Sequence, residues 1–360
     1  MNVEKKAALQ EILKNLPNYK LNDIKTVIES LGIKSPKTGN PLSDPYEFNL
    51  MFGIQIGPTG DQKGYLRPET AQGMFVNFKN LLDYNGGRMP FGCAQIGIGF
   101  RNEIAPRSGL LRVREFTLAE IEYFVDPQDK SHPKFKNYKN HVLTLFSKQA
   151  QAGDGKTFEM TVGEAVEKGI INNETLAYFM VRTHLFLLKV GCKNEGIRFR
   201  QHREDEMAHY SSDCWDAEVL TSYGWVELVG IADRSAYDLT RHTEATKKDL
   251  VAARKFTQPK LVKFIDLKLN KQLIGKTFKQ DNKLVVEYLE TLGEECKAQM
   301  KANFEKGEKY VITIKDKQFE ITPEMATLEA KEKNVMEEKY VPNVIEPAFG
   351  LGRIIYATWE

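Results

Sequence analysis

The stretch GFRNEIAPRSGLLRVREF, residues 99–116, predicts a β-hairpin with a strongly charged end. It holds four arginines and only two glutamates, in a chain whose formal net charge is +2. Apolar runs flank it on both sides, and Pro106 and Gly109 mark a turn between them. We therefore expect two strands, over residues 91–104 and 111–125, joined by this turn.

Alternation along these strands predicts which side chains meet, because every second residue of a strand shares a face. The simplest register places Arg101 opposite Arg114, and two arginines in that position repel unless an anion lies between them. The same register places Glu103 opposite Arg112, and Phe116 on the same face. Two interpretations remain open at this point. The hairpin is either a solvated, charge-rich surface, or a site where arginine forks hold a polyanion and a ring stacks on a base.

The composition is ordinary for a globular protein in water, with 41% hydrophobic and 28% charged residues among 360. No apolar run approaches the roughly 18 residues of a membrane span. The amphipathic start carries acidic residues, which is not typical of a signal peptide. The four cysteines are scattered without a CxxC pair, so we expect a reducing compartment.

Periodicity and turn signals divide the chain into parts. Apolar spacing predicts helices over residues 3–16 and 21–33. The expected parts are a helical segment over residues 1–48, a β-rich core over 49–126, a mostly helical insertion over 127–196, further core strands over 197–243, a lysine-rich α+β insertion over 244–340, and a strand, glycine turn and helix over 341–360.

Common nucleotide-binding motifs are absent from the sequence. The pair Gly97-x-Gly99 precedes a strand rather than a helix, and the P-loop-like residues 155–157 and 275–277 lack the required upstream glycine. The closing stretch IEPAFGLGRII instead places Arg353 in the first turn of a helix, where free N–H groups attract anions. An arginine lying on the surface beside a glycine turn is the alternative.

Several of these stretches resemble a known family. FRNE, RVREF and GLGR resemble motifs 2 and 3 of class II aminoacyl-tRNA synthetases. YLRPETAQG, EIAPRSGL and VIEPAFGLGR resemble glycyl-tRNA synthetases of the eukaryotic and archaeal dimeric type, and the resemblance covers essentially the whole chain. It implies an α+β fold, in which helices flank an antiparallel β-sheet core that carries helical and α+β insertions.

The resemblance also implies residue roles. Arg101 and Arg353 would be catalytic, and Glu227 would hold Mg²⁺. The implied ATP-binding residues are Arg101, Asn102, Glu103, Arg112, Val113, Phe116, Glu227, Leu228 and Arg353. The implied glycine-binding residues are Glu69, Glu120, Glu346, Pro347 and Ala348. At the last position the family usually has serine, so Ala348 removes a hydroxyl that would bind substrate.

The implied activity is the ATP-dependent activation of glycine and its transfer to tRNA(Gly), in the cytoplasm or in a mitochondrial form, by a homodimeric parent protein without membrane attachment. Motif 1 and the anticodon-binding domain are not recognisable, so we expect a fragment of a longer enzyme. Two alternatives remain: a non-catalytic synthetase-like protein that binds RNA or a protein partner, and a different acyl-adenylate ligase on the same fold.

Two further features have competing interpretations. In HREDEMAHYSSDCWD, the histidines, Cys214 and Asp216 match no standard zinc spacing, so we expect a structural role. The lysines of residues 244–280 and 297–306 either contact tRNA phosphates, in a salt-sensitive way, or form a solvated surface.

Overall fold

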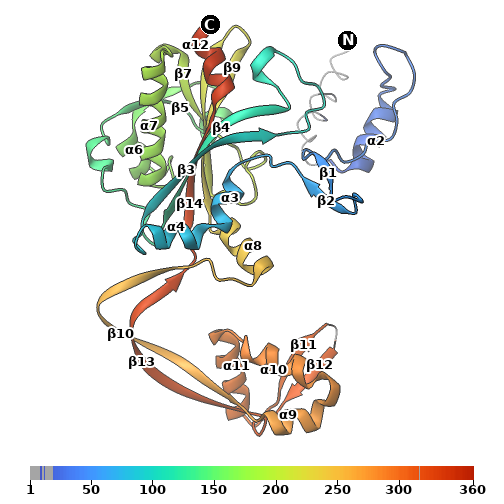
Figure 1. Ribbon diagram of the computed structural model, residues 1–360, viewed down its shortest axis with the longest axis vertical. Helices are drawn as coiled ribbons and strands as arrows, with labels where there is room; N and C mark the ends of the chain where they lie inside the picture. The colour runs from blue at the N-terminus through green and yellow to red at the C-terminus, as the bar shows by residue number, and fades with distance from the viewer. Residues whose placement is uncertain (1–8, 10–11, 13–18, 316) are drawn as a thin grey trace. The chain divides into compact units, whose positions relative to one another are not determined.

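The computed structural model describes residues 9, 12, 19–315 and 317–360. These residues fall into two compact units (Figure 1). The first runs up to Ala252 and resumes at Tyr340, and the second is Ala253–Lys339.

The two helices predicted at the start of the chain differ in outcome. The one over residues 3–16 lies outside the described residues, apart from Leu9 and Ile12. The second is present as α2 (Leu21–Ser30) and is followed by a small hairpin, β1 (Gly53–Ile56) with β2 (Gln62–Tyr65).

An eight-stranded sheet forms the centre of the first unit. Its neighbouring strands are antiparallel except for one parallel pair, β5 with β7. From edge to edge the strands are β3 (Phe91–Phe100), β4 (Glu115–Val125), β14 (Asn343–Gly350), β9 (Gly224–Ser235), β8 (Asp213–Thr221), β7 (Ile197–Gln201), β5 (Val142–Phe146) and β6 (Phe158–Thr161). The antiparallel core flanked by helices that the sequence predicts is therefore confirmed.

The sheet has one apolar and one polar face, because side chains alternate along each strand. On β8, Trp215 and Ala217 are buried in the largest apolar cluster, to which α7 (Glu174–Val190) contributes Met180. Helix α7 runs along this face in Figure 1. Asp216, between the two buried β8 residues, lies on the opposite face, which is where polar side chains gather.

Further helices close the ends of the sheet. Aromatic side chains of α3 (Ala71–Val76) and α4 (Phe78–Tyr84) pack with Leu239 of α8 (Tyr237–Thr246) in a second apolar cluster. Helix α12 (Leu351–Trp359) follows β14 directly and packs against β4 and β9. Among the described residues, no helix combines the length and apolar character needed to cross a membrane.

The predicted hairpin is present with the expected register. β3 pairs with β4 along its whole length, and the Arg101 amide donates to the Arg114 carbonyl at 2.9 Å. Both strands are shorter than predicted, which leaves residues 101–114 as a loop. Pro106 has no N–H to donate to a ladder, and Ser108 adopts a left-handed conformation with φ 60°.

The part predicted as mostly helical, residues 127–196, is a mixture. It supplies α5 (Lys148–Ala152), α6 (Val162–Glu167) and α7, but also the strands β5 and β6, which extend the sheet beyond β7. These strands have only five and four residues. In runs this short a period of 2 cannot be distinguished from a period of 3.6, so the sequence did not reveal them.

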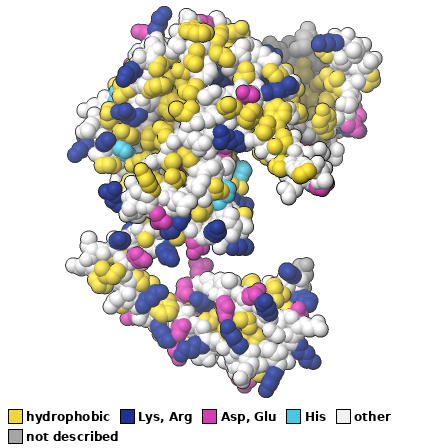
Figure 2. All heavy atoms as spheres, viewed as in Figure 1, with side chains coloured by type: hydrophobic (Ala, Val, Ile, Leu, Met, Phe, Trp, Pro, Cys, Tyr) yellow, Lys and Arg dark blue, Asp and Glu magenta, His cyan; other side chains and the backbone are white. Residues whose placement is uncertain are grey.

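The second unit has an apolar core of its own, which includes Ile274, Val285, Met300 and Phe319. On the face that Figure 2 shows, basic and acidic side chains are interspersed over this unit. Its elements are β10 (Ala252–Leu269), α9 (Lys271–Phe278), α10 (Asn282–Glu290), α11 (Glu294–Glu305), β11 (Tyr310–Ile314), β12 (Lys317–Ile321) and β13 (Ala326–Tyr340).

Candidate active site

A cavity of about 490 Å³ opens on the polar face of the sheet. Its walls come from the loop between β3 and β4, from β4 and β9, and from the junction of β14 with α12. Two of the residues that the resemblance assigns to glycine, Glu120 and Ala348, line it. So do most of those assigned to ATP, namely Arg101, Glu103, Arg112, Val113, Phe116, Glu227, Leu228 and Arg353.

The ring of Phe116 lies on the cavity wall because its partner on β3 is a glycine. A Cβ at Gly99 would lie 3.0 Å from this ring and 2.8 Å from Leu118. The guanidinium of Arg101 lies over the ring, 5.2 Å from its centroid, where the negative face of the ring attracts a cation. A ring beside an arginine fork is an arrangement that can stack a base and hold its phosphates.

The loop arginines have different partners. Arg112 Nε lies 3.8 Å from a carboxylate oxygen of Glu103, and both side chains are partly exposed. Arg114 donates from Nε and Nη2 to the Glu103 carbonyl, at 3.1 and 3.0 Å. The Arg114 side chain therefore links the two ends of the loop, whereas Arg101 and Arg112 line the cavity.

Arg353 joins three segments around the cavity. Its Nε donates to the Leu111 carbonyl at 3.2 Å, and its Nη1 donates to the carbonyl and carboxylate oxygens of Glu227, at 3.0 and 3.2 Å. The Glu227 side chain is still 48% exposed, so its carboxylate is accessible from the cavity. A carboxylate oxygen beside a phosphate site is a ligand that Mg²⁺ prefers, so this residue fits the ion.

Carboxyl groups from several segments gather around Glu120 of β4. Glu120 accepts from the Thr70 amide at 2.6 Å and also from the Thr70 hydroxyl. Glu346 accepts from Arg234 at 2.7 Å, and Glu69 lies 3.4 Å from the same guanidinium. Burial raises the pKa of Glu120, and it raises the pKa of Glu346 to about 7. This end of the site therefore favours a cation, while the other end favours anions.

Arg234 is the central cation of this group, and the sequence assigns it no role. It is 3% exposed, and it bonds to Asp238 at 2.9 Å as well as to Glu346. The rings of Tyr210 and Phe75 lie 4.5 and 5.3 Å from its guanidinium carbon. A single arginine near the end of β9 gives no local sign of such burial. The only available hint was the i, i+4 spacing of Arg234 and Asp238.

Four residues that the resemblance assigns to the site do not line the cavity. Glu69 and Glu346 pair with Arg234 next to Glu120, whereas Asn102 and Pro347 lie elsewhere. The backbone N–H of Asn102 donates to the Leu50 carbonyl at 2.7 Å, and its side-chain Nδ2 donates to the Asn49 carbonyl at 3.2 Å. Pro347 follows Glu346 directly along β14, so alternation places it on the opposite face of the sheet. Both residues are neighbours of site residues in sequence, and neither lines the cavity.

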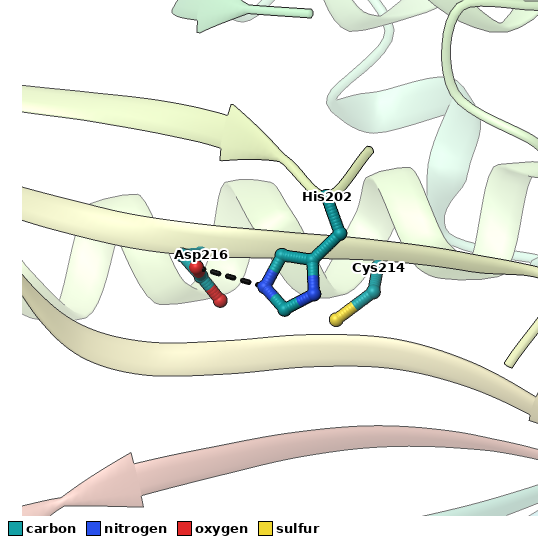
Figure 3. Close-up of side chains that lie close together, drawn as sticks. All are labelled: His202, Cys214 and Asp216. Atoms are coloured by element: carbon teal, nitrogen blue, oxygen red, sulfur yellow. Dashed lines mark hydrogen bonds and ion pairs between the residues drawn. The ribbon is translucent and has the colours of Figure 1, made fainter. Parts of the chain in front are cut away.

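His202, Cys214 and Asp216 lie together on β8 and the segment after β7 (Figure 3). His202 Nε2 bonds to Asp216 at 2.8 Å, and the same carboxylate oxygen accepts from Arg200 at 2.8 Å. Burial raises the pKa of the Cys214 thiol well above its usual value, so it stays a neutral thiol. His202 and Asp216 are thus bonded to each other, and Asp216 also to Arg200, which supports the structural role that we expect for this group.

Comparisons with known proteins agree with this geometry. A family described as the tRNA synthetase class II core domain (G, H, P, S and T) matches residues 55–360. Glycine–tRNA ligase from Bombyx mori is 49% identical over 99% of this chain and 49% of its own length. The glycine–tRNA ligase of Drosophila melanogaster is 50% identical over 98% of this chain and 46% of its own. That of Methanocaldococcus jannaschii is 42% identical over 94% and 60%.

The chain spans about half the length of the first two relatives. A solved prolyl-tRNA synthetase from Giardia lamblia, in complex with prolyl-adenylate, has a TM-score of 0.39 and 11% identity, over 86% of this chain and 36% of its own. A likeness of that size supports no argument about this chain.

Proposed function

Because the chain belongs to the class II tRNA synthetase core family, we propose that its cavity activates glycine with ATP and that the glycyl group then passes to tRNA(Gly). The observation that carries this proposal is the polarity of the site. One cavity joins an end with arginines and an aromatic ring to an end lined by the buried carboxyl of Glu120, whose neighbours are Glu122 and Glu346.

ATP would occupy the arginine end. Phe116 stacks on adenine while Arg353 covers its other face and reaches the phosphates. Arg101 holds the α-phosphate, and Arg112 holds the γ-phosphate. Glu103 accepts from the adenine amino group. These roles are supported by the lining of the cavity, which includes all five side chains. Val113 and Leu228 line the same wall, beside the nucleotide.

Glycine would occupy the carboxyl end, with its ammonium group held by Glu69 and Glu120 and the pocket closed by Glu346. An added side chain would meet these groups, and rejection by a clash is strong. Ala348 offers no hydroxyl here. Asn102 and Pro347 face away from the cavity, so we assign them no contact with substrate.

The chemistry needs no protein nucleophile. A carboxylate oxygen of glycine attacks the α-phosphorus in line, a P–O bond forms, and the bond to pyrophosphate breaks. Catalysis is then positioning together with stabilisation of the charge that develops on the phosphoryl oxygens, which Arg101 supplies. Mg²⁺, held by Glu227, would neutralise phosphate charge.

Other parts of the proposal rest on less. The cytoplasmic location and the homodimeric parent rest on the resemblance alone. A relative from Saccharomyces cerevisiae is named as mitochondrial, which keeps a mitochondrial form within the proposal. Contacts between tRNA and the lysine-rich residues 244–280 and 297–306 are supported only by the abundance of basic side chains there.

Amino-acid-dependent exchange between ATP and pyrophosphate tests the proposal. We expect exchange with glycine, and we expect Arg101→Ala to lower its rate by about 10²–10³, the effect of losing one donor that stabilises developing charge. Arg107→Ala is the matched control, because Arg107 belongs to the same loop but does not line the cavity.

Three other results of the exchange assay would contradict parts of the proposal. Near-normal exchange in Arg101→Ala would refute its assigned role. Exchange with another amino acid in place of glycine would favour a different adenylate ligase. No exchange with any amino acid would favour the non-catalytic alternative.

A further inference from the structure

Glu122 is a buried carboxyl group without a partner. It lies on β4, on the same face as Glu120, and has 0% exposed surface. Among the described residues, neither of its oxygens has a hydrogen-bond partner. An ionised carboxylate in this position would cost far more free energy than a neutral carboxyl, so such groups usually take up a proton.

The surroundings of Glu122 are themselves acidic. Oxygens of Glu120, Glu122 and Glu346 lie within 4.8 Å of one another. Like charges at this distance cannot all stay ionised away from water. The geometry alone therefore predicts that this group of carboxyls holds at least one proton.

Among the residues that the structure describes, the ionisable groups around Glu122 come from five elements and from Glu69, which precedes α3. The cross-strand partner on β3 is Cys93, whose thiol has its pKa raised by burial and stays neutral. The one cation is Arg234 of β9, which is shared among several carboxylates. The carboxyl groups are Glu69 before α3, Glu120 on β4, Glu346 on β14 and, through Arg234, Asp238 on α8.

We infer that Glu122 carries a proton when no substrate is bound, and that this group of carboxyls releases one proton when an ammonium group binds. The inference rests on the proposed function in one respect, namely that the cation is the glycine ammonium. Glu122 itself is a positioning residue, because it is fully buried beside Glu120 and Glu346 and does not line the cavity.

The electrostatics agree in direction with this inference. Burial, followed by repulsion from Glu346, raises the pKa of Glu122 well above its usual value. A positive ammonium close by favours the ionised form of each carboxyl and so lowers its pKa. Binding then releases a proton, and by linkage the affinity for glycine rises with pH, by at most about tenfold per pH unit while one proton is released.

The first experiment needs no substrate. In protein labelled with ¹³C at the glutamate carboxyl carbon, NMR should show one carboxyl that is still protonated at pH 8, where Glu346, with a pKa of about 7, is mostly ionised. That signal should be missing in Glu122→Gln and present in Glu159→Gln, a control on an exposed strand position. Full ionisation of every glutamate at pH 8, or a protonated signal that survives at this pH in Glu122→Gln, would overturn the inference.

The second experiment measures the released proton. Calorimetric titration of glycine in two buffers with different ionisation heats gives the number of protons released per glycine bound. We expect a release approaching one in the wild-type protein and in Glu159→Gln, and none in Glu122→Gln. The Gln amide is a permanent neutral donor, so this variant should still bind glycine at neutral pH.

The two experiments separate the two proposals. Binding of glycine without proton release, or equal release in Glu122→Gln, would overturn the inference but not the proposed function. If glycine does not bind while the NMR signal behaves as expected, the proposed function and the ammonium part of the inference both fail, and only the stored proton remains.

Discussion

At the scale of single residues, Ala348 is the position of the site where the sequence differs most clearly from the family, which usually has serine there. Its methyl group lies on the cavity wall, opposite Glu120 on β4 and Gly230 on β9. A serine hydroxyl there would add a hydrogen bond of about 0.5–1.5 kcal/mol. We therefore expect Ala348→Ser to lower the KM for glycine by about two- to tenfold, with the KM for ATP unchanged, as measured by pyrophosphate exchange.

The matched control for this change is Ala94→Ser, on the exposed side of β3. It should leave both KM values as they are. An unchanged or raised KM for glycine in Ala348→Ser would show that position 348 does not contact the substrate.

The same scale shows what the sequence could predict of the site. Alternation along one strand placed Phe116 and Glu120 on one face correctly. It also offered a signal for Glu122, to which we assigned no role, since Glu120 and Glu122 alternate with the apolar residues of the second half of β4. Such spacing marks buried carboxyl groups that need partners. Arg234 could not be found in this way, because its burial depends on groups that are more than a hundred residues away.

At the scale of elements, β3 leaves room for the Phe116 ring of β4, because Gly99 of β3 has no side chain. A side chain at Gly99 would overlap Phe116 and Leu118. Overpacking of this kind typically costs about 1–3 kcal/mol. We expect Gly99→Ala to displace the Phe116 ring and to raise the KM for ATP by about tenfold, while the KM for glycine changes little.

Gly196→Ala is the control for this prediction, because an added Cβ there meets nothing within 4 Å. It should leave both KM values unchanged. If Gly99→Ala binds ATP as tightly as the wild-type protein, stacking by Phe116 is not important for binding.

The packing of α7 predicts a loss of stability in acid. His132 is 8% exposed, stacks on Tyr178 of α7 at 3.7 Å, and accepts at Nδ1 from the Lys134 amide at 3.2 Å. Burial lowers its pKa from 6.5 to about 4. The folded state therefore holds the neutral ring, and its contribution is complete above pH 6.5 and is lost as the pH falls towards 4.

Urea unfolding across this range measures the effect. Between pH 7 and 4.5 we expect the wild-type protein to lose roughly 2–3 kcal/mol of unfolding free energy relative to His132→Phe, which has no proton to gain. A constant difference between the two proteins across this range would contradict the prediction.

Element boundaries show why part of the fold escaped prediction. The strands β3 and β4 were predictable because they are long and alternate regularly. Their ends were not, since the turn signals at Pro106 and Gly109 mark only the middle of a loop of fourteen residues, 101–114. There, fixation by Arg114 and the conformation at Ser108 decide the path of the chain. The short strands β5 and β6 depend on the sheet edge formed by β7, a partner that local periodicity does not reveal.

At the scale of the whole molecule, the two units differ in whether they contribute to the cavity. All residues that line the cavity belong to the first unit. The second has its own core, and its terminal strands lie next to each other, with Arg254 bonded to Glu338 at 3.2 Å. We expect a protein in which a short flexible linker replaces residues 253–339 to stay folded and to retain glycine-dependent pyrophosphate exchange.

Circular dichroism of the shortened protein provides the folding control. Loss of exchange from a protein that remains folded would show that the second unit takes part in activation. Reduced charging of tRNA with normal pyrophosphate exchange would instead show that the second unit contributes to tRNA binding, as we propose from its lysines.

The extent of this unit was only partly predictable. The change to a lysine-rich texture near residue 244 indicated an insertion. Composition does not mark where a fold begins, and α8 continues to Thr246 before the second unit starts at Ala253. That boundary is set by packing, because Leu239 of α8 belongs to the core of the first unit.

The central claim is that this cavity joins glycine to ATP, and one measurement tests it directly. The protein is mixed with ATP, Mg²⁺ and glycine, the reaction is stopped with acid within a single turnover, and the products are analysed by mass spectrometry. The account predicts glycyl-adenylate, in an amount approaching one per protein chain, and none when alanine replaces glycine. Bound ATP without any glycyl-adenylate, or an adenylate formed with another amino acid instead, would contradict it.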